Sequence, residues 1–244
     1  MLRALLRLVM ITAVASILAI LAVVFVRWMG FQQAFKAPPH PWFEQSYWRI
    51  YEAPLAQICS GKDVSAALPG KDWIIKVTVK RKDDDWLIPC SEPLRLADFL
   101  KAQPHPDWIL NVIAHDTWAL DKLVETVTPF DSAKHFAVMT ESQKASVFLR
   151  KKAPEWLYAA DSASLLRFRL FESLWIDTAM DFWPDFIITS FNETKEGFRL
   201  DERGAAELQR RQKRIIWNKD EGSTPPAGIS PQGIMTAKPA DALD

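Results

Sequence analysis

The stretch that decides the fold runs from Ile75 to Glu92, IKVTVKRKDDDWLIPCSE. It predicts a hairpin, with a strand IKVTV, a charged turn KRKDDD and a second short strand WLIPC. Side chains two residues apart on a strand point to the same face, so Lys76 and Thr78 share one face. In a barrel strand that face can be the interior, close to where the chemistry of barrel enzymes takes place. The residue types at 76 and 78 therefore bear on whether this chain is an enzyme.

Outward from this hairpin, short apolar runs alternate with helical patterns. The predicted strands are Trp48–Tyr51, Trp73–Val79, Trp86–Cys90, Trp108–Ala114, His135–Met139, Trp156–Ala160, Phe186–Ser190 and Arg214–Trp217. The predicted helices are Pro93–Lys101, Trp118–Val127, Glu141–Lys151, Ser162–Thr178 and Asp201–Arg211. This alternation indicates parallel βαβ units, in either an open doubly wound sheet or a closed (β/α)8 barrel. No glycine-rich phosphate loop follows the first strand, which counts against a dinucleotide-binding sheet.

The N-terminus predicts a membrane anchor. Leu8 to Val26 is an uncharged apolar run, and about 20 such residues span a bilayer as a helix. A cleaved signal peptide is the alternative, but its apolar region is normally shorter and ends in a small-x-small site. The Ala13-Val14-Ala15 triplet lies in the middle of the run, which favours an uncleaved anchor.

The charges around this run predict its orientation. Arg3 and Arg7 precede it and favour a cytoplasmic N-terminus, although Arg27 and Lys36 follow it and weaken the bias. We expect a cytoplasmic N-terminus at 1–7, an anchor at 8–28, a stiff proline-rich linker at 29–41 and one domain at 42–244. The domain then lies outside the cytoplasmic membrane, in the periplasm if the source is Gram-negative.

The amino-acid composition argues against nucleic acid as a partner. The 244 residues carry 30 basic and 30 acidic side chains, so no net charge favours nucleic acid. The 11 tryptophans predict packing in the core and interfaces, because no basic patch is interleaved with them. The two cysteines, Cys59 and Cys90, would pair in an oxidising compartment, and two buried thiols are the equal alternative.

Two further segments bear on how the domain is built. Ser162–Thr178 (SASLLRFRLFESLWIDT) is either an outer helix packed on its strands, which we favour, or a helix lying on a membrane surface. Glu221–Asp244 is rich in Pro, Gly, Ser and Ala, and by composition alone it is a disordered tail.

The order of these pieces resembles the glycerophosphodiester phosphodiesterases, within the phospholipase C-like TIM-barrel superfamily. The hairpin is similar to the family's second-strand block, I-E-x-D-V-x-x-T-x-D-G-x-x-V-x-x-H-D. Other similar segments are Glu52-Ala53-Pro54 (A-P-E-N-T), Leu94–Leu100 (T-L-E-E-x-L), Leu110–His115 (L-x-I-E-I-K), Lys152-Ala153-Pro154, Arg214–Trp217 (W-T-V-N) and Gly233–Pro239 (D-G-I-I-T-D-x-P). The resemblance implies a (β/α)8 barrel behind one transmembrane helix, with the tail as its closing strand rather than a disordered segment.

The resemblance also implies chemistry that this chain has lost. In that family, carboxylates hold a divalent cation and two histidines act as acid and base on a phosphodiester. Here no histidine lies between His40 and His105. Lys76 and Thr78 replace the E-x-D ligands, Ser91-Glu92 replaces the H-D pair, and His115 takes the place of the third strand's lysine. An ammonium repels a cation, and a serine hydroxyl has no useful acid–base pKa near neutrality.

We therefore expect no catalytic residues, no metal site and no cofactor. The hypothetical binding residues at the barrel mouth are Lys76, Thr78, Ser91, His115 and Trp217. Lys76 would hold an anion where the family keeps its metal, although a lysine with no ligand is an equal alternative. Asp83-Asp84-Asp85 lack the spacing of a calcium loop and indicate a solvated turn.

Three functions share this fold. The first is a membrane-anchored binding protein for a phosphate-bearing small molecule or an envelope protein. The second is a divergent hydrolase of glycerophosphodiesters in lipid metabolism. The third is a structural, membrane-tethered protein whose tryptophan-rich surface docks on another protein.

Overall fold

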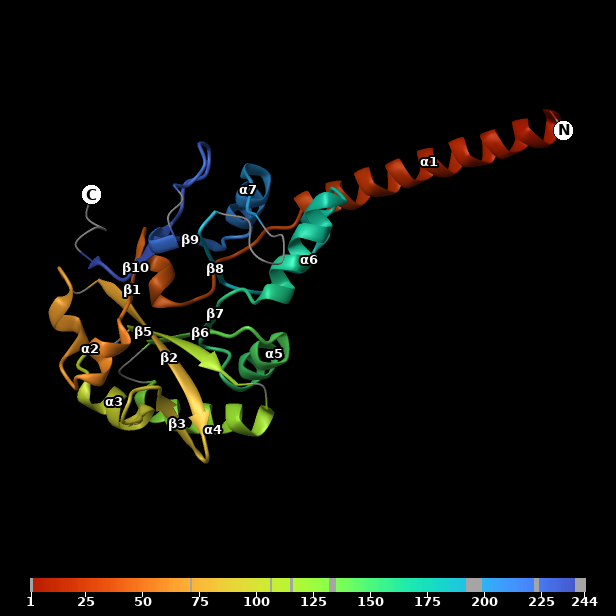
Figure 1. Cartoon of the computed structure of the whole chain (residues 1–244). Coiled ribbons are helices and arrows are strands. Elements are labelled where there is room, and N and C mark those ends of the chain that lie inside the picture. Colours follow the sequence, from red (N-terminus) through yellow and green to blue (C-terminus); the bar gives the residue numbers. More distant parts are fainter. Residues whose placement is uncertain are drawn as a thin grey trace.

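The computed structural model describes residues 2–70, 72–105, 107–114, 116–131, 135–191, 199–221 and 224–239 (Figure 1). Its strands are β1 (Trp48–Glu52), β2 (Trp73–Lys82), β3 (Asp85–Ile88), β4 (Leu94–Arg95), β5 (Asp107–Ile113), β6 (His135–Met139), β7 (Leu157–Tyr158), β8 (Phe186–Thr189), β9 (Arg214–Asn218) and β10 (Gly233–Thr236). Its α-helices are α1 (Leu2–Phe31), α2 (Leu55–Cys59), α3 (Leu96–Ala102), α4 (Thr117–Val127), α5 (Gln143–Lys152), α6 (Ser162–Ser173) and α7 (Glu202–Arg210). Short 3-10 turns are η1 (Pro41–Glu44), η2 (Val64–Ala67), η3 (Thr128–Phe130), η4 (Asp177–Ala179) and η5 (Lys219–Glu221).

Eight parallel strands form a nearly closed barrel. Their order is β7-β6-β5-β2-β1-β10-β9-β8. A single bridge between Ala159 and Phe186 joins the two ends, and the Ala160 amide donates to the Phe186 carbonyl at 2.9 Å. This arrangement confirms the closed barrel and excludes the open sheet. The hairpin strand β3 pairs antiparallel with β2 and lies outside the ring.

The C-terminal tail supplies the closing strand. β10 pairs in parallel with β1 on one side and with β9 on the other. A Cβ on Gly233 would lie 2.7 Å from the Trp48 carbonyl oxygen and 2.6 Å from an Ile216 methyl carbon, so only glycine fits there. The structure thus confirms the strand that the resemblance implied, and the disordered-tail interpretation is wrong for the described part.

Period-two alternation along the strands separates the barrel interior from the outer layer. The interior cluster includes Ile50, Ile74, Ile109 and Ile216, and Trp42 of η1 packs into it. The residues between them point outward to the helices, as Ile75 and Val77 do on β2. Interior and exterior are therefore both apolar, which is why these strands read as continuous hydrophobic runs.

Helices α4 to α7 begin where the sequence predicts, because each starts after an Asp or Ser that caps it. The side-chain oxygens of Asp116, Ser142, Asp161 and Asp201 accept hydrogen bonds from amides three residues ahead. α6 ends earlier than predicted, at Ser173, and the chain then turns into η4. The short helix α2 was not predicted.

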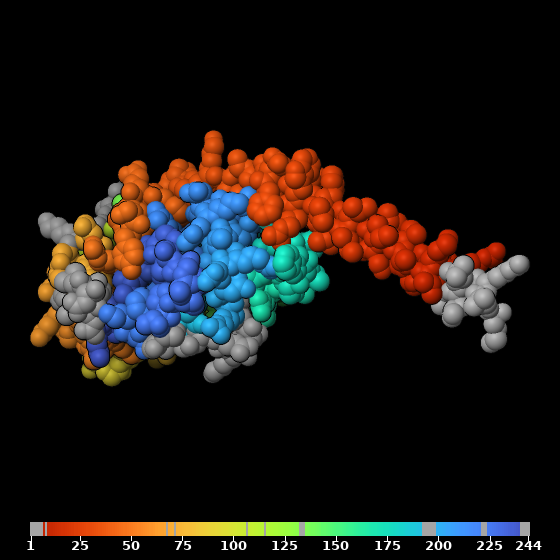
Figure 2. All heavy atoms as spheres, turned by 90° about the horizontal axis from the view of Figure 1, so that it is seen from above, coloured from red at the N-terminus to blue at the C-terminus, as the bar shows by residue number. Residues whose placement is uncertain are grey.

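The C-terminal end of helix α1 packs on the barrel, while the rest of α1 extends away from it (Figures 1 and 2). Arg27 Nη1 lies 3.6 Å from the Asp177 carboxylate, and Thr178 Oγ1 donates to the Arg27 carbonyl at 3.2 Å. The expected linker also lies on the barrel, since the Phe35 ring packs under the guanidinium of Arg211. Residues 32–40 therefore do not act as a spacer.

Candidate functional site

The candidate site lies at the carboxyl ends of the barrel strands. Parallel strands end together on one face, so the last interior-facing residues of several strands meet there. Toward this end of the interior cluster, these residues are Glu52 on β1, Lys76 and Thr78 on β2, Asn111 on β5 and Asn218 on β9. We call this set the mouth layer. It is the first polar layer above an apolar core.

An ion pair joins the first two strands of the mouth layer. Lys76 Nζ donates to Glu52 Oε1 at 2.7 Å, and the two residues are register partners on β2 and β1. The Lys76 side chain is 10% exposed, while that of Glu52 is 41% exposed. Because a buried ammonium needs a counter-charge, Glu52 neutralises Lys76, and its carboxylate is therefore not available to bind a cation.

A hydrogen bond between two uncharged side chains joins β2 to its other neighbour, β5. Asn111 Nδ2 donates to Thr78 Oγ1 at 3.2 Å, across register partners on β5 and β2. Thr78 keeps its own hydroxyl hydrogen for another acceptor. This pair therefore offers a donor at the mouth without adding charge.

Asn218 on β9 has an unpartnered acceptor. Its side chain is 7% exposed, and its Oδ1 atom has no hydrogen-bond partner among the described residues. Buried polar atoms in proteins are nearly always paired with protein, water or ligand. This oxygen is therefore an unpaired acceptor buried below the surface of the mouth layer.

An open cleft of about 720 Å³ lies over the mouth layer. Its lining residues are Glu52, Ala53, Pro54, Leu55, Thr78, Pro89, Asp220, Ala237 and Lys238. Asp220 accepts from Thr236 Oγ1 at 2.9 Å and from the Ala237 amide, so its carboxylate ties η5 to the end of β10. Lys238 also lines the cleft, and neither its ammonium nor the Asp220 carboxylate has an ion-pair partner among the described residues, so the cleft holds one charge of each sign besides the paired Glu52.

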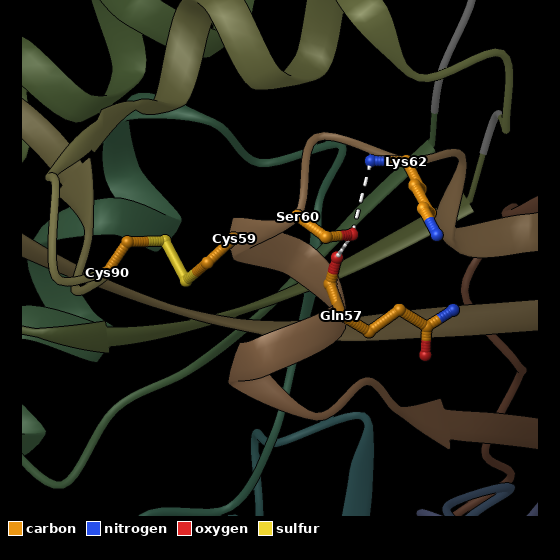
Figure 3. Close-up of a disulfide and its surroundings, with 5 residues drawn as sticks. All are labelled: Gln57, Cys59, Ser60, Lys62 and Cys90. Carbon is orange, nitrogen blue, oxygen red and sulfur yellow. Dashed lines mark hydrogen bonds between the residues drawn. A yellow bond between two sulfur atoms is a disulfide. The ribbon is translucent and has the colours of Figure 1, made fainter.

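A disulfide holds one wall of the cleft (Figure 3). Cys59 ends α2, and Cys90 follows β3; their Cα atoms are 5.6 Å apart. The bond joins the segments that contribute Leu55 and Pro89 to the cleft. Ser60 Oγ extends this turn, since it donates to the Gln57 carbonyl at 2.7 Å and accepts from the Lys62 amide.

Comparison with solved structures finds a barrel of similar fold with a TM-score above 0.5. No protein-family model matches the sequence, and no curated protein matches it significantly. Among solved structures, the glycerophosphoryl diester phosphodiesterase domain of an uncharacterised Mycobacterium tuberculosis protein is similar, with a TM-score of 0.51 and 11% identity over 81% of this chain and 98% of that one. A provisionally named glycerophosphoryl diester phosphodiesterase from Silicibacter pomeroyi has a TM-score of 0.45 and 13% identity, over 62% of this chain and 55% of that one.

This chain folds as a glycerophosphodiester phosphodiesterase-like TIM barrel. At such low identity the likeness concerns the fold alone. The chemistry of this phosphodiesterase-like barrel has to be argued from its own mouth layer.

The predicted site residues divide into three groups. Lys76 and Thr78 lie in the mouth layer of the phosphodiesterase-like barrel. Ser91 is exposed beyond the disulfide, and Pro89 is the cleft residue from its segment. His115 lies outside the described residues.

The placement of Trp217 needs correction. Its side chain packs with the outer cluster between the sheet and α6 and α7, and not in the mouth. Neighbouring residues on a strand point to opposite faces, so the interior residue of β9 is Asn218. Sequence reasoning also missed Glu52, Asn111, Asp220 and Lys238. The period-two signal from Ile50 to Glu52 and from Ile216 to Asn218 would have found Glu52 and Asn218.

The described mouth residues do not fit a divalent cation. Among the residues that the structure covers, no group of three or more His, Cys, Asp or Glu side chains is placed to hold one. Glu52 is paired with an ammonium, and Asp220 is hydrogen-bonded to β10. A hard cation would have to displace Lys76, which has the wrong charge.

A second cavity of about 540 Å³ lies at the opposite end of the strands, under residues 35–40. Its charged residues largely neutralise one another, as Lys213 and Asp185 do at 3.9 Å. Burial raises the pKa of the Asp185 carboxyl and lowers that of the Lys213 ammonium. Burial and the neighbouring His135 lower the pKa of His40, beside this cavity, to about 4. These groups connect the N-terminal segment to the barrel base.

Proposed function

We propose that this chain is a membrane-anchored binding protein whose barrel mouth takes a phosphate-bearing small molecule without hydrolysing it. The observation that carries the proposal is the Lys76–Glu52 ion pair. A cation occupies the interior position of β2 where the family resemblance implies a metal-binding carboxylate. The nearest carboxylate of the mouth layer is engaged in neutralising it.

Charge supports the loss of metal-dependent hydrolysis. Two like unit charges about 4 Å apart repel by roughly 4 kcal/mol at an effective dielectric near 20. A divalent cation next to Lys76 would meet at least this repulsion, and Glu52 would have to leave its present partner. The described residues of the mouth layer also lack a histidine to move a proton.

The remaining polar groups favour a phosphate ester. Lys238 supplies an ammonium in the cleft, and Thr78 supplies a hydroxyl donor. The Asp220 carboxylate lines the same cleft and can accept a hydrogen bond from a ligand hydroxyl. A molecule such as glycerol 3-phosphate carries both an anion and hydroxyl donors, and its small volume suits the cleft.

The membrane part of the proposal rests on α1 and on the disulfide. Within the described chain, Val9–Phe31 is the stretch long and apolar enough to cross a membrane. The Cys59–Cys90 bond suits an oxidising compartment, and the basic N-terminus favours the cytoplasmic side for residues 1–7. We therefore place the barrel outside the cytoplasmic membrane.

The direction of the cleft favours a soluble ligand. Its walls include α2 and the end of the described tail, and both lie on the side of the barrel away from α1 (Figures 1 and 2). A lipid headgroup in the bilayer that holds α1 lies at the far end from this cleft. The ligand therefore reaches the mouth from the aqueous side.

The full chain in detergent should bind glycerol 3-phosphate without turning over glycerophosphodiesters. The expected result is a rise in unfolding temperature with glycerol 3-phosphate, because a ligand that binds only the folded state stabilises it. Hydrolysis is measured as released alcohol with Mg²⁺ or Ca²⁺ present. Turnover that a chelator abolishes would show a divergent hydrolase instead. Neither binding nor turnover, with an envelope protein co-purifying, would favour the structural alternative.

Glu52→Gln should tighten phosphate binding, because it removes the charge that neutralises Lys76. One unit charge about 6 Å from the phosphate contributes roughly 0.7–2.8 kcal/mol at dielectrics between about 80 and 20, so we expect a change on the order of tenfold. Titration calorimetry with inorganic phosphate measures it. Lys76→Met and Lys238→Met should weaken binding, and unchanged affinity in all three variants would place the anion elsewhere.

A further inference from the structure

Helix α6 is apolar on two sides, and the barrel covers one of them. Phe168 is buried against the outer cluster, and Leu165 and Phe171 pack beside it. On the opposite side, Leu166, Leu170 and Leu174 are 43%, 56% and 53% exposed. Their spacing of four residues forms one continuous stripe along the helix. An exposed apolar stripe on a surface helix usually marks a surface that contacts another protein or a membrane.

Trp175 continues this stripe in an unusual backbone conformation. It follows the last turn of α6 with a φ of 61°, in the left-handed region that glycine normally occupies at this position. The Trp175 amide donates to the Glu172 carbonyl, and the Ile176 amide donates to the Phe171 carbonyl, which completes the usual helix-ending motif. The indole is nevertheless 61% exposed. A large aromatic side chain held outward at a glycine position indicates a role at the surface.

The stripe ends beside the anchor helix. Arg27 Nη1 donates to the Trp175 carbonyl at 3.2 Å, and the Arg27 guanidinium lies 5.5 Å from the centre of the indole ring. A Cβ on Gly30 would lie 2.5 Å from the Thr178 carbonyl oxygen, so α1 and η4 are in direct backbone contact. Figures 1 and 2 show α6 beside α1 where α1 leaves the barrel.

The position of Arg27 sets the depth of the stripe. Leu8 to Val26 would fill the hydrocarbon core, since about 20 helical residues cross about 30 Å. Arg27 then lies at the headgroup level, and Trp175 lies with it. Tryptophan is enriched at this level of membranes. Arg167 is also exposed on α6, where it suits anionic headgroups.

We infer that the outer face of α6, with Leu166, Leu170, Leu174 and Trp175, lies in the headgroup region of the leaflet where α1 leaves the membrane. This inference rests on the proposed anchoring by α1. The occupant of the face is lipid, because the face is continuous with the anchor and combines leucine, tryptophan and arginine. The contact fixes the orientation of the barrel, so that its mouth points away from the bilayer.

Site-directed spin labelling of the full chain tests the inference. Both cysteines are in the disulfide, so an added cysteine is the single reactive thiol among the described residues. Leu170→Cys and Leu174→Cys are labelled and reconstituted in vesicles of phosphatidylcholine and phosphatidylglycerol. We expect collisions with oxygen to be frequent and those with a soluble nickel complex to be several-fold rarer than at Leu55→Cys, a matched exposed leucine on α2.

A label at Ile17→Cys, in the middle of α1, tests whether α1 spans the membrane independently of the α6 contact. A deep label at 17 with water-exposed labels at 170 and 174 would overturn the α6 contact and leave the anchor intact. Labels at 170 and 174 shielded from both oxygen and nickel would show a protein partner and also overturn the inference. A water-exposed label at 17 would overturn both proposals.

Trp175→Gly tests the role of the indole in a chain that still folds. Glycine suits the left-handed backbone at 175, so the unfolding temperature should stay the same or rise. The nickel accessibility of a label at 170 should increase several-fold if the indole holds α6 at the surface. Unchanged accessibility would assign Trp175 to stacking on Arg27 and Arg203 alone.

Discussion

A chain that ends after Gln232 should fail to fold. It lacks β10, which pairs with β1 on one side and β9 on the other, so both strands would be left with unpaired backbone groups inside the ring. The loss also opens the interior cluster at Met235 to water. A domain is stabilised by only about 5–15 kcal/mol in total, and breaking the ring at its first strand should remove all of it. Circular dichroism and size-exclusion chromatography of the truncated chain measure the outcome.

A chain that ends after Pro239 is the matched control, because it keeps β10 and the Thr236–Asp220 hydrogen bond. It should unfold like the full chain. Gly233→Ala probes the same strand more finely. The added Cβ meets the Trp48 backbone at 2.7 Å, and overpacking of this kind costs about 1–3 kcal/mol or more. A cooperative thermal transition in the chain that ends after Gln232 would show that the barrel closes without its last strand.

The double variant Cys59→Ala/Cys90→Ala should lose about 3–4 kcal/mol of stability. The disulfide closes a loop with a sequence separation of 31, and the loop-entropy relation gives this magnitude for such a length. For a domain of about 200 residues this corresponds to a fall in unfolding temperature of roughly 10 °C. Chemical and thermal denaturation of the full chain under oxidising conditions measure both quantities.

The reduced wild-type chain provides the control for this variant. Added reductant should lower the unfolding temperature of the wild type by a similar amount and leave the double variant unchanged. Because the bond holds the cleft wall that contains Leu55 and Pro89, the variant should also bind glycerol 3-phosphate more weakly. Equal stability of the wild type with and without reductant would contradict this account of the disulfide.

Much of the fold is predictable from the sequence because the strands are buried on both faces. Their apolar runs stand out between polar caps, and seven of the predicted strands match ring strands with small differences at the ends. The predicted strand Trp86–Cys90 is the hairpin strand β3, and β10 was implied by the family resemblance alone. The exception is α2, whose five residues are too few to show a helical period. The linker at 29–41 was predicted as a spacer from its prolines, but the sequence pattern does not reveal that Phe35 packs under Arg211.

The candidate site was harder to predict, because it depends on which residues of different strands share a layer. Lys76 and Thr78 were placed on the interior face from period two within a single strand. Trp217 was placed on the wrong face, because alternation along β9 puts Ile216 and Asn218 inside the barrel and Trp217 outside it. The Glu52 partner of Lys76 is a register neighbour from another strand, which no spacing along the chain reveals.

By itself the sequence determined the parallel βαβ units and the apolar N-terminal helix, because these follow from local periodicity and composition, whereas the closed barrel and its last strand were implied by the family resemblance. It also determined that an ammonium, and not a carboxylate, stands at position 76. Only the tertiary structure decided that Glu52 neutralises this ammonium, that the elements lining the cleft lie on the side of the barrel away from α1, and that one apolar side of α6 stays uncovered. Each of these depends on segments far apart in the chain, and barrel closure alone brings them together.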